Sequence, residues 1–288
     1  MKSIVLRKMK VVRKIKRMQS IAWEAKRKGK TIGFVPTMGY LHEGHLNLVR
    51  IARKRSDLSV VSIFVNPLQF GPKEDFKEYP RDINRDKKLL EREKVDILFY
   101  PDEKEMYPDD FATYIKIERL TEGLCGRSRP GHFQGVATVV GKLFNIVMPD
   151  FAVFGQKDAQ QALVIKRMVR DLNLPIKIIV APTVREKDGL AMSSRNIYLA
   201  PNERKEATVL YHSLMMAREM IKKGERNPSL IIGKMREMIE EKNGKIDYIS
   251  IVDTKELRDL DLIKGEVLIA LAVYFGKTRL IDNIILKV

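Results

Sequence analysis

The sequence has one cysteine, no long apolar run and no signal-peptide pattern. Cys125 is the single cysteine, so the chain cannot form an intramolecular disulfide, and no cysteine or histidine neighbours it at the spacing of a structural zinc site. No apolar run reaches the roughly 18 residues of a transmembrane helix, and Met1 to Arg27 alternates apolar with basic side chains. We therefore expect a cytoplasmic protein that has no membrane as a partner.

Common nucleotide-binding and nucleophile motifs are also missing. The stretch from Gly135 to Leu143 resembles a P-loop, but five residues separate its two glycines and Leu143 stands where Ser or Thr must hold magnesium. The sequence has no Gly-x-Gly-x-x-Gly and no serine in a Gly-x-Ser-x-Gly turn, and Cys125 has only His132 near it. We expect Gly135 to Val147 to form a packed helix, and no protein nucleophile to act.

What the sequence does contain is a large excess of positive charge. The formal net charge is +17 over 288 residues, and clustered Lys and Arg gain free energy by releasing counterions from nucleic-acid phosphates. Much of this charge lies between apolar residues at helical spacing, as it does around Met9, Val12, Ile15 and Ile21. This distribution is typical of a solvated helix face, so we expect no nucleic-acid partner.

Strand and helix patterns alternate through residues 1–182. Apolar runs predict buried strands, the first ending at Pro36, and apolar residues three and four apart predict helices. Such alternation produces parallel strands joined by crossover helices, so we expect an α/β fold, a Rossmann-like doubly wound parallel sheet with its ligand at the carboxyl ends of the strands. The strands are expected at 31–35, 58–65, 96–100, 151–154 and 176–180, and the helices at about 7–28, 43–55, 83–93, 135–148 and 158–172.

The order of elements changes after Pro182. A loop runs through Asn196, helical patterns follow at 202–222 and 229–242, and strand patterns lie at 248–252 and 267–275. We therefore expect a second, smaller α+β domain over residues 183–288. With 44% hydrophobic residues, the chain is long enough to bury two modest cores.

The strongest local signal is His42-Glu43-Gly44-His45, which lies where an expected strand gives way to a helix. Backbone N–H groups and the macrodipole at a helix N-terminus attract anions, and Gly44 permits their close approach. His42 and His45 are three residues apart, so both imidazoles are expected to face one phosphate. A zinc-protease helix needs histidines four residues apart, so we expect no metal site here.

Two further segments suit phosphate oxygens, although neither is specific by itself. Gly155-Gln156-Lys157-Asp158 follows an expected strand and offers the positive charge of Lys157 at the start of a helix. Taken alone, it is explained better as a turn in which Asp158 caps the helix. Met192-Ser193-Ser194-Arg195-Asn196 lies in a loop and offers two hydroxyls beside a guanidinium.

Together, the histidine turn and the loop at 192–196 resemble the paired ATP-binding signatures of the nucleotidyltransferase superfamily that includes class I aminoacyl-tRNA synthetases. Within that superfamily, the sequence from about Thr31 to Arg204 resembles the pantothenate synthetases, or pantoate–β-alanine ligases. Stretches that match in order are far more specific than any one of them. They are Phe34 to His45, Phe64 to Phe70, Gly131 to Val136, Phe154 to Asp158 and Met192 to Asn196.

This resemblance implies an activity. Members of the family use ATP to activate (R)-pantoate as an acyl adenylate and then join it to β-alanine, which gives pantothenate, AMP and pyrophosphate on the route to coenzyme A. Mg2+ is expected to travel with the ATP phosphates and to have few protein ligands of its own. The resemblance also implies a homodimer, and a C-terminal domain that closes over the ATP site.

The resemblance assigns residues as well, with His45 as the leading catalytic candidate. The catalytic set would be His45, His42, Lys157, Ser193, Ser194 and Arg195. The ATP site would further include Met38, Gly39, Tyr40, Leu41, Glu43, Gly44, Gly155, Gln156, Asp158, Val184 and Met192. Pantoate would contact Gln69 and Gln161, with Asn66, Arg129 and His132 also on the substrate side.

Two other functions stay open from the sequence. A nucleotidyltransferase could use the same histidine turn to move a nucleotide onto a phosphorylated acceptor, although the amides of Asn66, Gln69 and Gln161 suit a small hydroxy acid better than a second phosphate. A synthetase-derived RNA-binding protein would account for the positive charge. It would need an anticodon-type domain, for which the roughly 100 residues after Ala181 leave little room.

Overall fold

The computed structural model describes residues 9–72 and 74–288, and the chain divides into two compact units. Unit 1 consists of Met1–Ile117, Gly131–Gly155 and Ile165–Ala181. Unit 2 consists of Glu118–Pro130, Gln156–Val164 and Pro182–Val288, so it takes up two segments that precede residue 182. The boundary between functional domains at residues 182 and 183 remains a prediction.

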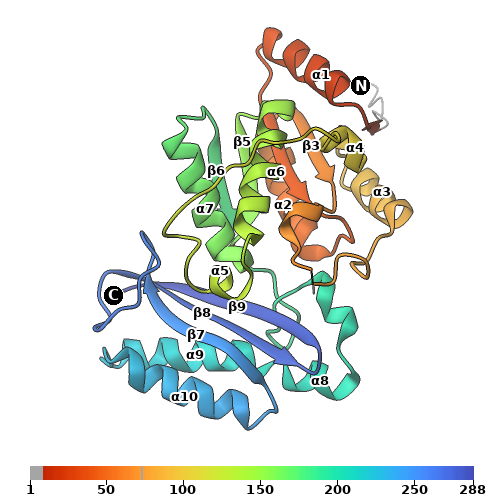
Figure 1. Cartoon of the computed structure of the whole chain (residues 1–288). Helices are drawn as coiled ribbons and strands as arrows, with labels where there is room; N and C mark the ends of the chain where they lie inside the picture. Colours follow the sequence, from red (N-terminus) through yellow and green to blue (C-terminus); the bar gives the residue numbers. More distant parts are fainter. Residues whose placement is uncertain (1–8, 73) are drawn as a thin grey trace, which may run out of the picture. The chain divides into compact units, whose positions relative to one another are not determined.

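Unit 1 is built, within the described residues, on a six-stranded sheet in which all neighbours are parallel. In spatial order its strands are β1 (Lys10–Val12), β4 (Ile97–Phe99), β3 (Leu58–Ile63), β2 (Ile32–Thr37), β5 (Phe151–Gly155) and β6 (Lys177–Ala181). Figure 1 shows helices on both sides of this sheet. The expected α/β, doubly wound fold is confirmed. Its helical elements are α1 (Ile15–Arg27), α2 (Glu43–Arg55), η1 (Pro67–Gln69), α3 (Ile83–Arg92), α4 (Glu103–Met106), α6 (His132–Val147) and the second half of α7 (Ala159–Asp171).

The strands of unit 1 are buried on both faces because alternate side chains enter two different hydrophobic layers. Phe34 of β2 packs in one layer with α1 and α6, and the next residue, Val35, packs in the other with α2 and α3. The same alternation separates Val60 from Val61 in β3. A strand with two buried faces has a continuous apolar sequence, which is why such runs predict this fold.

The order in which the chain adds strands to the sheet reverses between β2 and β5, although these two strands are parallel. β2 pairs with β3 on one side and with β5 on the other. From β2 the chain builds the sheet toward β3 and β4, whereas β5 and β6 extend it toward the opposite edge. The loops after two such strands diverge, which leaves room for a ligand at their carboxyl ends.

Two details of unit 1 differ from the sequence prediction. β2 does not stop at Pro36 but continues to Thr37. Its pairing with β5 ends at Phe34, so only β3 pairs with the segment around Pro36, as at a sheet edge where proline is tolerated. The predicted helix over 7–28 is wrong at its start, because β1 forms the edge of the sheet by pairing with β4, and α1 begins only at Ile15. Residues 7 and 8 lie outside the described ones.

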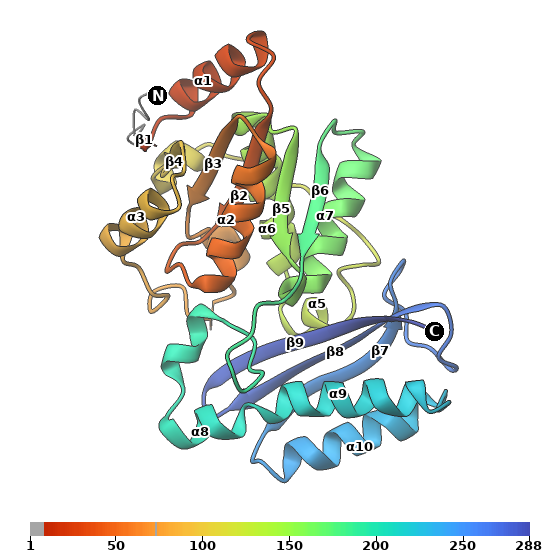
Figure 2. The same cartoon turned by 180° about the vertical axis from the view of Figure 1, so that it is seen from behind.

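Unit 2 contains, among the described residues, a three-stranded antiparallel sheet of β7 (Lys245–Asp253), β8 (Glu266–Phe275) and β9 (Thr278–Lys287). Figure 2 shows α9 (Val209–Lys222) and α10 (Pro228–Glu240) side by side along one face of this sheet. Apolar side chains of both helices share one core with all three strands. The expected second, smaller α+β fold is confirmed.

The other helical elements of unit 2 are short. They are α5 (Cys125–Ser128), η2 (Gln156–Asp158), the first half of α7, η3 (Ser194–Tyr198) and α8 (Pro201–Glu206). Across residues 9–72 and 74–288, every helix falls short of the length and apolar character that a bilayer-crossing segment requires.

Polar contacts attach residues 118–130 to the sheet of unit 2. Ser128 Oγ donates to Asp247 of β7 at 2.9 Å. Arg279 of β9 pairs with the same carboxylate at 2.7 Å, and its guanidinium lies 3.6 Å from the sulfur of Cys125. Ser128 lies 119 residues before Asp247 and Cys125 lies 154 residues before Arg279, so no local sequence pattern predicts these two contacts.

The sequence prediction for unit 2 was wrong in two places. It missed β9, whose polar pair Asp282 and Asn283 interrupts the alternation expected of a half-buried strand. The helix predicted over 202–222 is two helices, α8 and α9, because the N–H groups of Thr208 and Leu210 bond back only three residues instead of four.

Replacing a buried ring of unit 1 should cost far more stability than replacing an exposed one. Phe34 is 0% exposed and packs edge-on against Phe144, whereas Trp23 is 59% exposed. We expect Phe34→Ala to lower the free energy of unfolding by about 3–5 kcal/mol, and Trp23→Ala by less than about 0.5 kcal/mol. Urea denaturation measures both, and equal losses would contradict the assignment of Phe34 to the core.

Candidate functional site

The turn that follows β2 has a backbone conformation that few residues adopt. Gly39 has φ +88°, and a Cβ there would lie 2.9 Å from Ile63 Cγ2, so glycine is required for both reasons. Tyr40 also has a positive φ, +47°. Consecutive left-handed residues turn the chain sharply from β2 into the first turn of α2.

The carboxylate of Asp86 on α3 holds this turn. It accepts the backbone N–H groups of Tyr40 at 2.7 Å and Leu41 at 2.8 Å, and the residue is 1% exposed. Burial raises the pKa of Asp86, whereas the two N–H bonds act to lower it. The sequence analysis did not identify Asp86. A signal was present, because Ile83, Asp86 and Leu90 share one helix face by their spacing, and a carboxylate in a buried stripe needs such partners.

His42 and His45 lie together at the N-terminus of α2, as their spacing predicted. Their ring centroids are 4.0 Å apart. His42 Nδ1 accepts the N–H of Gly44 at 3.1 Å, and His45 Nδ1 accepts the N–H of His42 at 3.3 Å. Because each ring accepts at Nδ1, its neutral form carries the proton on Nε2, which makes Nε2 a hydrogen-bond donor. A pair of donors at a helix N-terminus suits an anion such as phosphate.

Four of the predicted site residues form one network beside this turn in unit 1. Asn66 Nδ2 donates to Gln69 Oε1 at 3.2 Å, and Gln69 Nε2 lies 2.9 Å from the sulfur of Met38. His132 Nδ1 donates to the carbonyl of Gln69 at 2.8 Å. The Tyr107 hydroxyl, which the sequence analysis missed, donates to Asn66 Oδ1 at 2.8 Å. Asn66 and Met38 therefore contact the side chain of Gln69, and His132 holds its backbone carbonyl.

Gly135 allows the first turns of α6 to approach η1 closely. A Cβ at residue 135 would lie 2.2 Å from the carbonyl oxygen of Leu68 and 2.6 Å from the nitrogen of Gln69. The carbonyl of Gly135 accepts a bond from Asn66 Nδ2 at 3.1 Å. The sequence Gly131 to Val136 is thus part of the support for Gln69, while 132–147 forms the packed helix that the sequence predicts.

A cavity of about 200 Å3 lies in unit 1 beside the same turn. Met38, Gly39 and Tyr40 line it, as do Asp86 and Tyr100. The turn therefore borders space that a small ligand group can enter. The carboxylate of Glu43 forms an ion pair with Arg50. Arg50 also pairs with Glu93.

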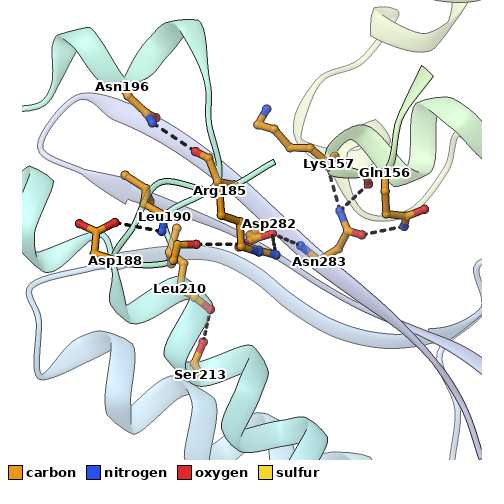
Figure 3. Close-up of polar contacts among 12 residues, drawn as sticks. Gln156, Lys157, Arg185, Asp188, Leu190, Asn196, Leu210, Ser213, Asp282 and Asn283 are labelled. Carbon is orange, nitrogen blue, oxygen red and sulfur yellow. Dashed lines mark hydrogen bonds and ion pairs between the residues drawn. The ribbon is translucent and has the colours of Figure 1, made fainter. Parts of the chain in front are cut away.

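In unit 2, the turn at Gln156–Asp158 is bonded to β9. The carbonyls of Gln156 and Lys157 both accept from Asn283 Nδ2, at 3.0 and 2.8 Å (Figure 3). The side chain of Lys157 is 22% exposed and its Nζ lies 3.7 Å from Asp158. Lys157 is thus a half-buried cation on a fixed turn, and not the solvated lysine of a plain loop.

The loop at 184–192 in unit 2 is a short hairpin. Arg185 and Ala191 form an isolated antiparallel bridge, and the N–H of Met192 donates to the carbonyl of Val184 at 3.0 Å. Ser193 follows directly and caps η3, where its Oγ accepts the N–H of Arg195 at 3.3 Å. Val184 and Met192 therefore lie next to each other, and Ser193, Ser194 and Arg195 continue from the same end of the hairpin.

The remaining substrate candidates lie on unit 2 as well. Gln161 is half-buried on α7, and Arg129 follows α5. The neighbour of Gln161, the buried Gln160, accepts the N–H of Cys125 at 3.0 Å and donates to the carbonyls of Leu120 and Gly123, each at 2.9 Å. Gln160 fixes the segment that leads to Arg129, and sequence analysis passed over it in favour of Gln161.

The structure thus brings the predicted residues together in two groups, each within its own unit. The group in unit 1 is Met38 to His45 with Asn66, Gln69 and His132, and Gly155 ends β5 in the same unit. The group in unit 2 is Gln156 to Asp158, Gln161, Arg129, Val184 and Met192 to Arg195. Among residues 9–72 and 74–288, no three His, Cys, Asp or Glu side chains cluster as metal ligands.

The chain is similar to known proteins along almost its whole length. The sequence model described as pantoate-beta-alanine ligase matches residues 10–285. The pantothenate synthetase of Caldicellulosiruptor bescii is 60% identical over 280 residues, which cover 97% of this chain and 99% of that protein. The pantothenate synthetase of Acetivibrio thermocellus is 58% identical over 281 residues, which cover 97% of this chain and 100% of that one.

Solved structures of pantothenate synthetases also superpose on this chain. The pantothenate synthetase of Thermus thermophilus superposes with a TM-score of 0.88 at 45% identity, covering 96% of this chain and 99% of that one. The pantoate-beta-alanine ligase of Francisella tularensis, complexed with beta-gamma ATP and β-alanine, superposes with a TM-score of 0.79 at 38% identity. That match covers 96% of this chain and 97% of the other.

Removing the carboxylate of Asp86 should release the turn at 39–41. Asp86→Ala leaves one buried and one partly buried N–H group without their acceptor, so we expect a loss of about 2–4 kcal/mol in the free energy of unfolding and faster amide exchange at Tyr40 and Leu41. The control is Asp102→Ala, which removes a cap that accepts one N–H, from Glu105, and should cost only about 1 kcal/mol. Unchanged exchange at Tyr40 and Leu41 would show that Asp86 does not hold the turn.

Proposed function

Because this chain belongs to the pantoate-beta-alanine ligase family, we propose that it joins pantoate to β-alanine in a reaction driven by ATP. The products are pantothenate, AMP and pyrophosphate, and pantoyl adenylate is the intermediate. The observation that carries this proposal is the match over 97% of the chain, at 60% identity, to a pantothenate synthetase. Family membership favours this reaction over nucleotide transfer to a phosphorylated acceptor, the alternative that the histidine turn alone left open.

ATP is proposed as the substrate that the histidine turn binds. The Francisella relative was solved in a complex with an ATP ligand and β-alanine, which supports the same two substrates here. In this chain the donor Nε2–H groups of His42 and His45 and the N-terminus of α2 suit the oxygens of a phosphate. The sequence motifs assign Lys157 and Ser193 to Arg195 to the same nucleotide.

In the first half-reaction, a pantoate carboxylate oxygen attacks the α-phosphorus of ATP. A new O–P bond forms, and the bond from the α-phosphorus to the bridging oxygen breaks as pyrophosphate leaves. Negative charge grows on the phosphoryl oxygens and on the leaving group. Donors and cations that are fixed before the reaction stabilise this charge without reorganisation, which is the role proposed for the catalytic set: His42, His45, Lys157, Ser193, Ser194 and Arg195.

Pantoate is proposed to bind through the amides of Gln69 and Gln161. The Nε2 group of Gln69 lies 2.9 Å from the thioether of Met38, and a thioether sulfur is a weak acceptor. Gln69 can therefore exchange this contact for a pantoate oxygen at little cost. Asn66 and His132 hold the rest of Gln69 in place, and Arg129 is proposed to attract the carboxylate of a substrate.

In the second half-reaction, the neutral amine of β-alanine attacks the acyl carbon of the adenylate. An N–C bond forms, the C–O bond to AMP breaks, and the amine proton passes to solvent. Mg2+ is proposed to arrive with the ATP phosphates, whose charge it neutralises when bound. The residues around the proposed phosphate positions offer mainly N–H and O–H donors rather than a carboxylate cluster, and this fits a metal that the nucleotide carries.

We also propose that the protein works as a homodimer in the cytoplasm and without a nucleic-acid partner, as the family resemblance implies. Light scattering after size-exclusion chromatography tests the oligomeric state. A mass of two chains is expected, and a mass of one chain at working concentration would contradict the dimer.

Pyrophosphate release tests the proposed function directly. With ATP and Mg2+, pantoate alone should release pyrophosphate and leave pantoyl adenylate, which mass spectrometry identifies. Adding β-alanine should then convert the adenylate to pantothenate and AMP. A folded protein that releases no pantoate-dependent pyrophosphate would contradict the proposed function.

The role of His45 gives a sharper prediction. His45→Ala removes an Nε2–H donor from the proposed phosphate position, so we expect the rate of pyrophosphate release to fall by about 100-fold or more while the protein stays folded. The matched control is His212→Ala, because His212 is an exposed histidine on α9 and belongs to neither group of site residues. Near-normal turnover of the His45→Ala protein would show that His45 has no catalytic role.

A further inference from the structure

Strand β9 departs from the usual alternation of buried and exposed side chains at one point. Asn283 lies on the same face as Ile281 and Ile285, which are half-buried and exposed, yet Asn283 itself is 4% exposed. The preceding Asp282 is 2% exposed. Because consecutive side chains of a strand leave opposite faces, each of these polar residues is covered by a different part of the chain.

Asn283 is covered by the turn that carries Lys157. Its Nδ2 donates to the carbonyls of Gln156 at 3.0 Å and Lys157 at 2.8 Å, and its Oδ1 accepts from Gln156 Nε2 at 2.9 Å (Figure 3). One buried amide thus bonds to two consecutive residues through both its nitrogen and its oxygen. These bonds fix the direction of both peptide groups, and with it the point from which the Lys157 side chain leaves the backbone.

Asp282 holds the hairpin that leads to Ser193. Arg185 donates to both carboxylate oxygens of Asp282, at 2.5 and 3.0 Å, and also to the carbonyl of Gly189 at 3.1 Å (Figure 3). The same Arg185 is bridged to Ala191 across the hairpin. A bidentate pair between a guanidinium and a carboxylate restricts both distance and orientation, so it ties the hairpin to β9 in one arrangement.

The charges of Asp282, Arg185 and Lys157 link the hairpin to the turn of Lys157. Burial raises the pKa of Asp282, and the ion pair with Arg185 and the nearby positive charge of Lys157 act against that rise. The carboxylate therefore interacts with the hairpin through Arg185 and with the neighbouring turn through the charge of Lys157. The two polar side chains of β9 are part of one arrangement within unit 2.

We infer that Asp282 and Asn283 are positioning residues for ATP, Asn283 for the turn of Lys157 and Asp282 for the hairpin that continues into Ser193, Ser194 and Arg195. The inference rests on the proposed function, which assigns both segments to the ATP phosphates. Neither Asp282 nor Asn283 acts on ATP itself. Each fixes a segment in advance, so that its donors are already in place when phosphate charge develops.

A double-mutant cycle tests the part of Asn283. The ATP dependence of pyrophosphate release is measured at saturating pantoate for the wild type, Asn283→Ala, Lys157→Ala and the double variant. If Asn283 acts through Lys157, its removal should lower kcat/KM for ATP by about tenfold or more in the wild-type background and by less than about twofold in the Lys157→Ala background. The KM for pantoate should stay within about twofold of the wild-type value in Asn283→Ala.

The matched control is Asn227→Ala. Asn227 also holds two backbone groups, the N–H groups of Ser229 at 2.9 Å and Leu230 at 3.3 Å, but at the start of α10. Its removal should lower the melting temperature and leave kcat/KM for ATP unchanged. Equal factors for Asn283→Ala in both backgrounds, or a loss no larger than that of Asn227→Ala, would overturn the inference.

A second cycle tests Asp282 with an isosteric change. Asp282→Asn removes the charge that Arg185 pairs with, so it should lower kcat/KM for ATP strongly alone and only slightly when combined with Arg195→Ala. Asp247→Asn is the control, because Asp247 forms a comparable pair with Arg279 on the same sheet, at 2.7 Å, and should show no such dependence on Arg195. Independent, multiplying effects of Asp282→Asn and Arg195→Ala would refute the role of Asp282.

A variant that does not fold and a failure of the proposed function are distinguished from a failure of this inference. If Asn283→Ala does not fold by circular dichroism, Asn283→Asp takes its place in the cycle, since it keeps the acceptor and the size but loses both donor bonds. A folded wild type without pantoate-dependent pyrophosphate release would refute the proposed function only. The rise in melting temperature on adding ATP then tests the inference by itself, and an equal rise in wild type and Asn283→Ala would overturn it.

Discussion

A parallel sheet that is buried on both faces can present functional groups to a ligand only at the ends of its strands. This constraint decides where the candidate site of unit 1 lies. Phe34 and Val35 enter opposite hydrophobic layers, so neither face of β2 is open to a ligand. The chain can present polar groups only after the strand ends, in the turn at 38–45. The strand order reverses between β2 and β5, which makes the carboxyl ends of these strands the favoured position for a ligand.

The backbone groups of loops at strand ends lack the hydrogen bonds that neighbouring strands exchange. In this protein, buried polar side chains from elements distant in sequence bond to them instead. Asp86 on α3 accepts two N–H groups of the turn after β2, and Asn66 bonds to the carbonyl of Gly135. In unit 2, Gln160 bonds to two carbonyls of the segment before Cys125, and Asn283 bonds to two carbonyls of the turn of Lys157. A buried side chain that satisfies a loop in this way also fixes its geometry, because leaving either partner unpaired is costly.

The sequence predicted the parts of this protein that depend on local pattern. The buried strands, most helices and the histidine pair follow from periodicity and from the position of His42 and His45 at a strand-to-helix turn. Strand β9 was missed because Asp282 and Asn283 look like a polar break until their partners are known. The turn of Lys157 covers Asn283, and Arg185 pairs with Asp282. Asp86 was missed although its spacing with Leu90 indicates a buried helix face, because the turn that it holds lies 45 and 46 residues earlier in the chain. Contacts between segments far apart in sequence decide which group a buried polar side chain binds, and periodicity in a single sequence does not identify that partner.

The central chemical claim is that the carboxylate of pantoate attacks the α-phosphorus of ATP, so that one of its oxygens leaves with AMP. Pantoate labelled with 18O on both carboxylate oxygens tests this claim in a single turnover with ATP and β-alanine. We expect one 18O in the phosphate of AMP, one in the amide carbonyl of pantothenate and none in pyrophosphate. Unlabelled AMP, or 18O in orthophosphate released together with ADP, would contradict it.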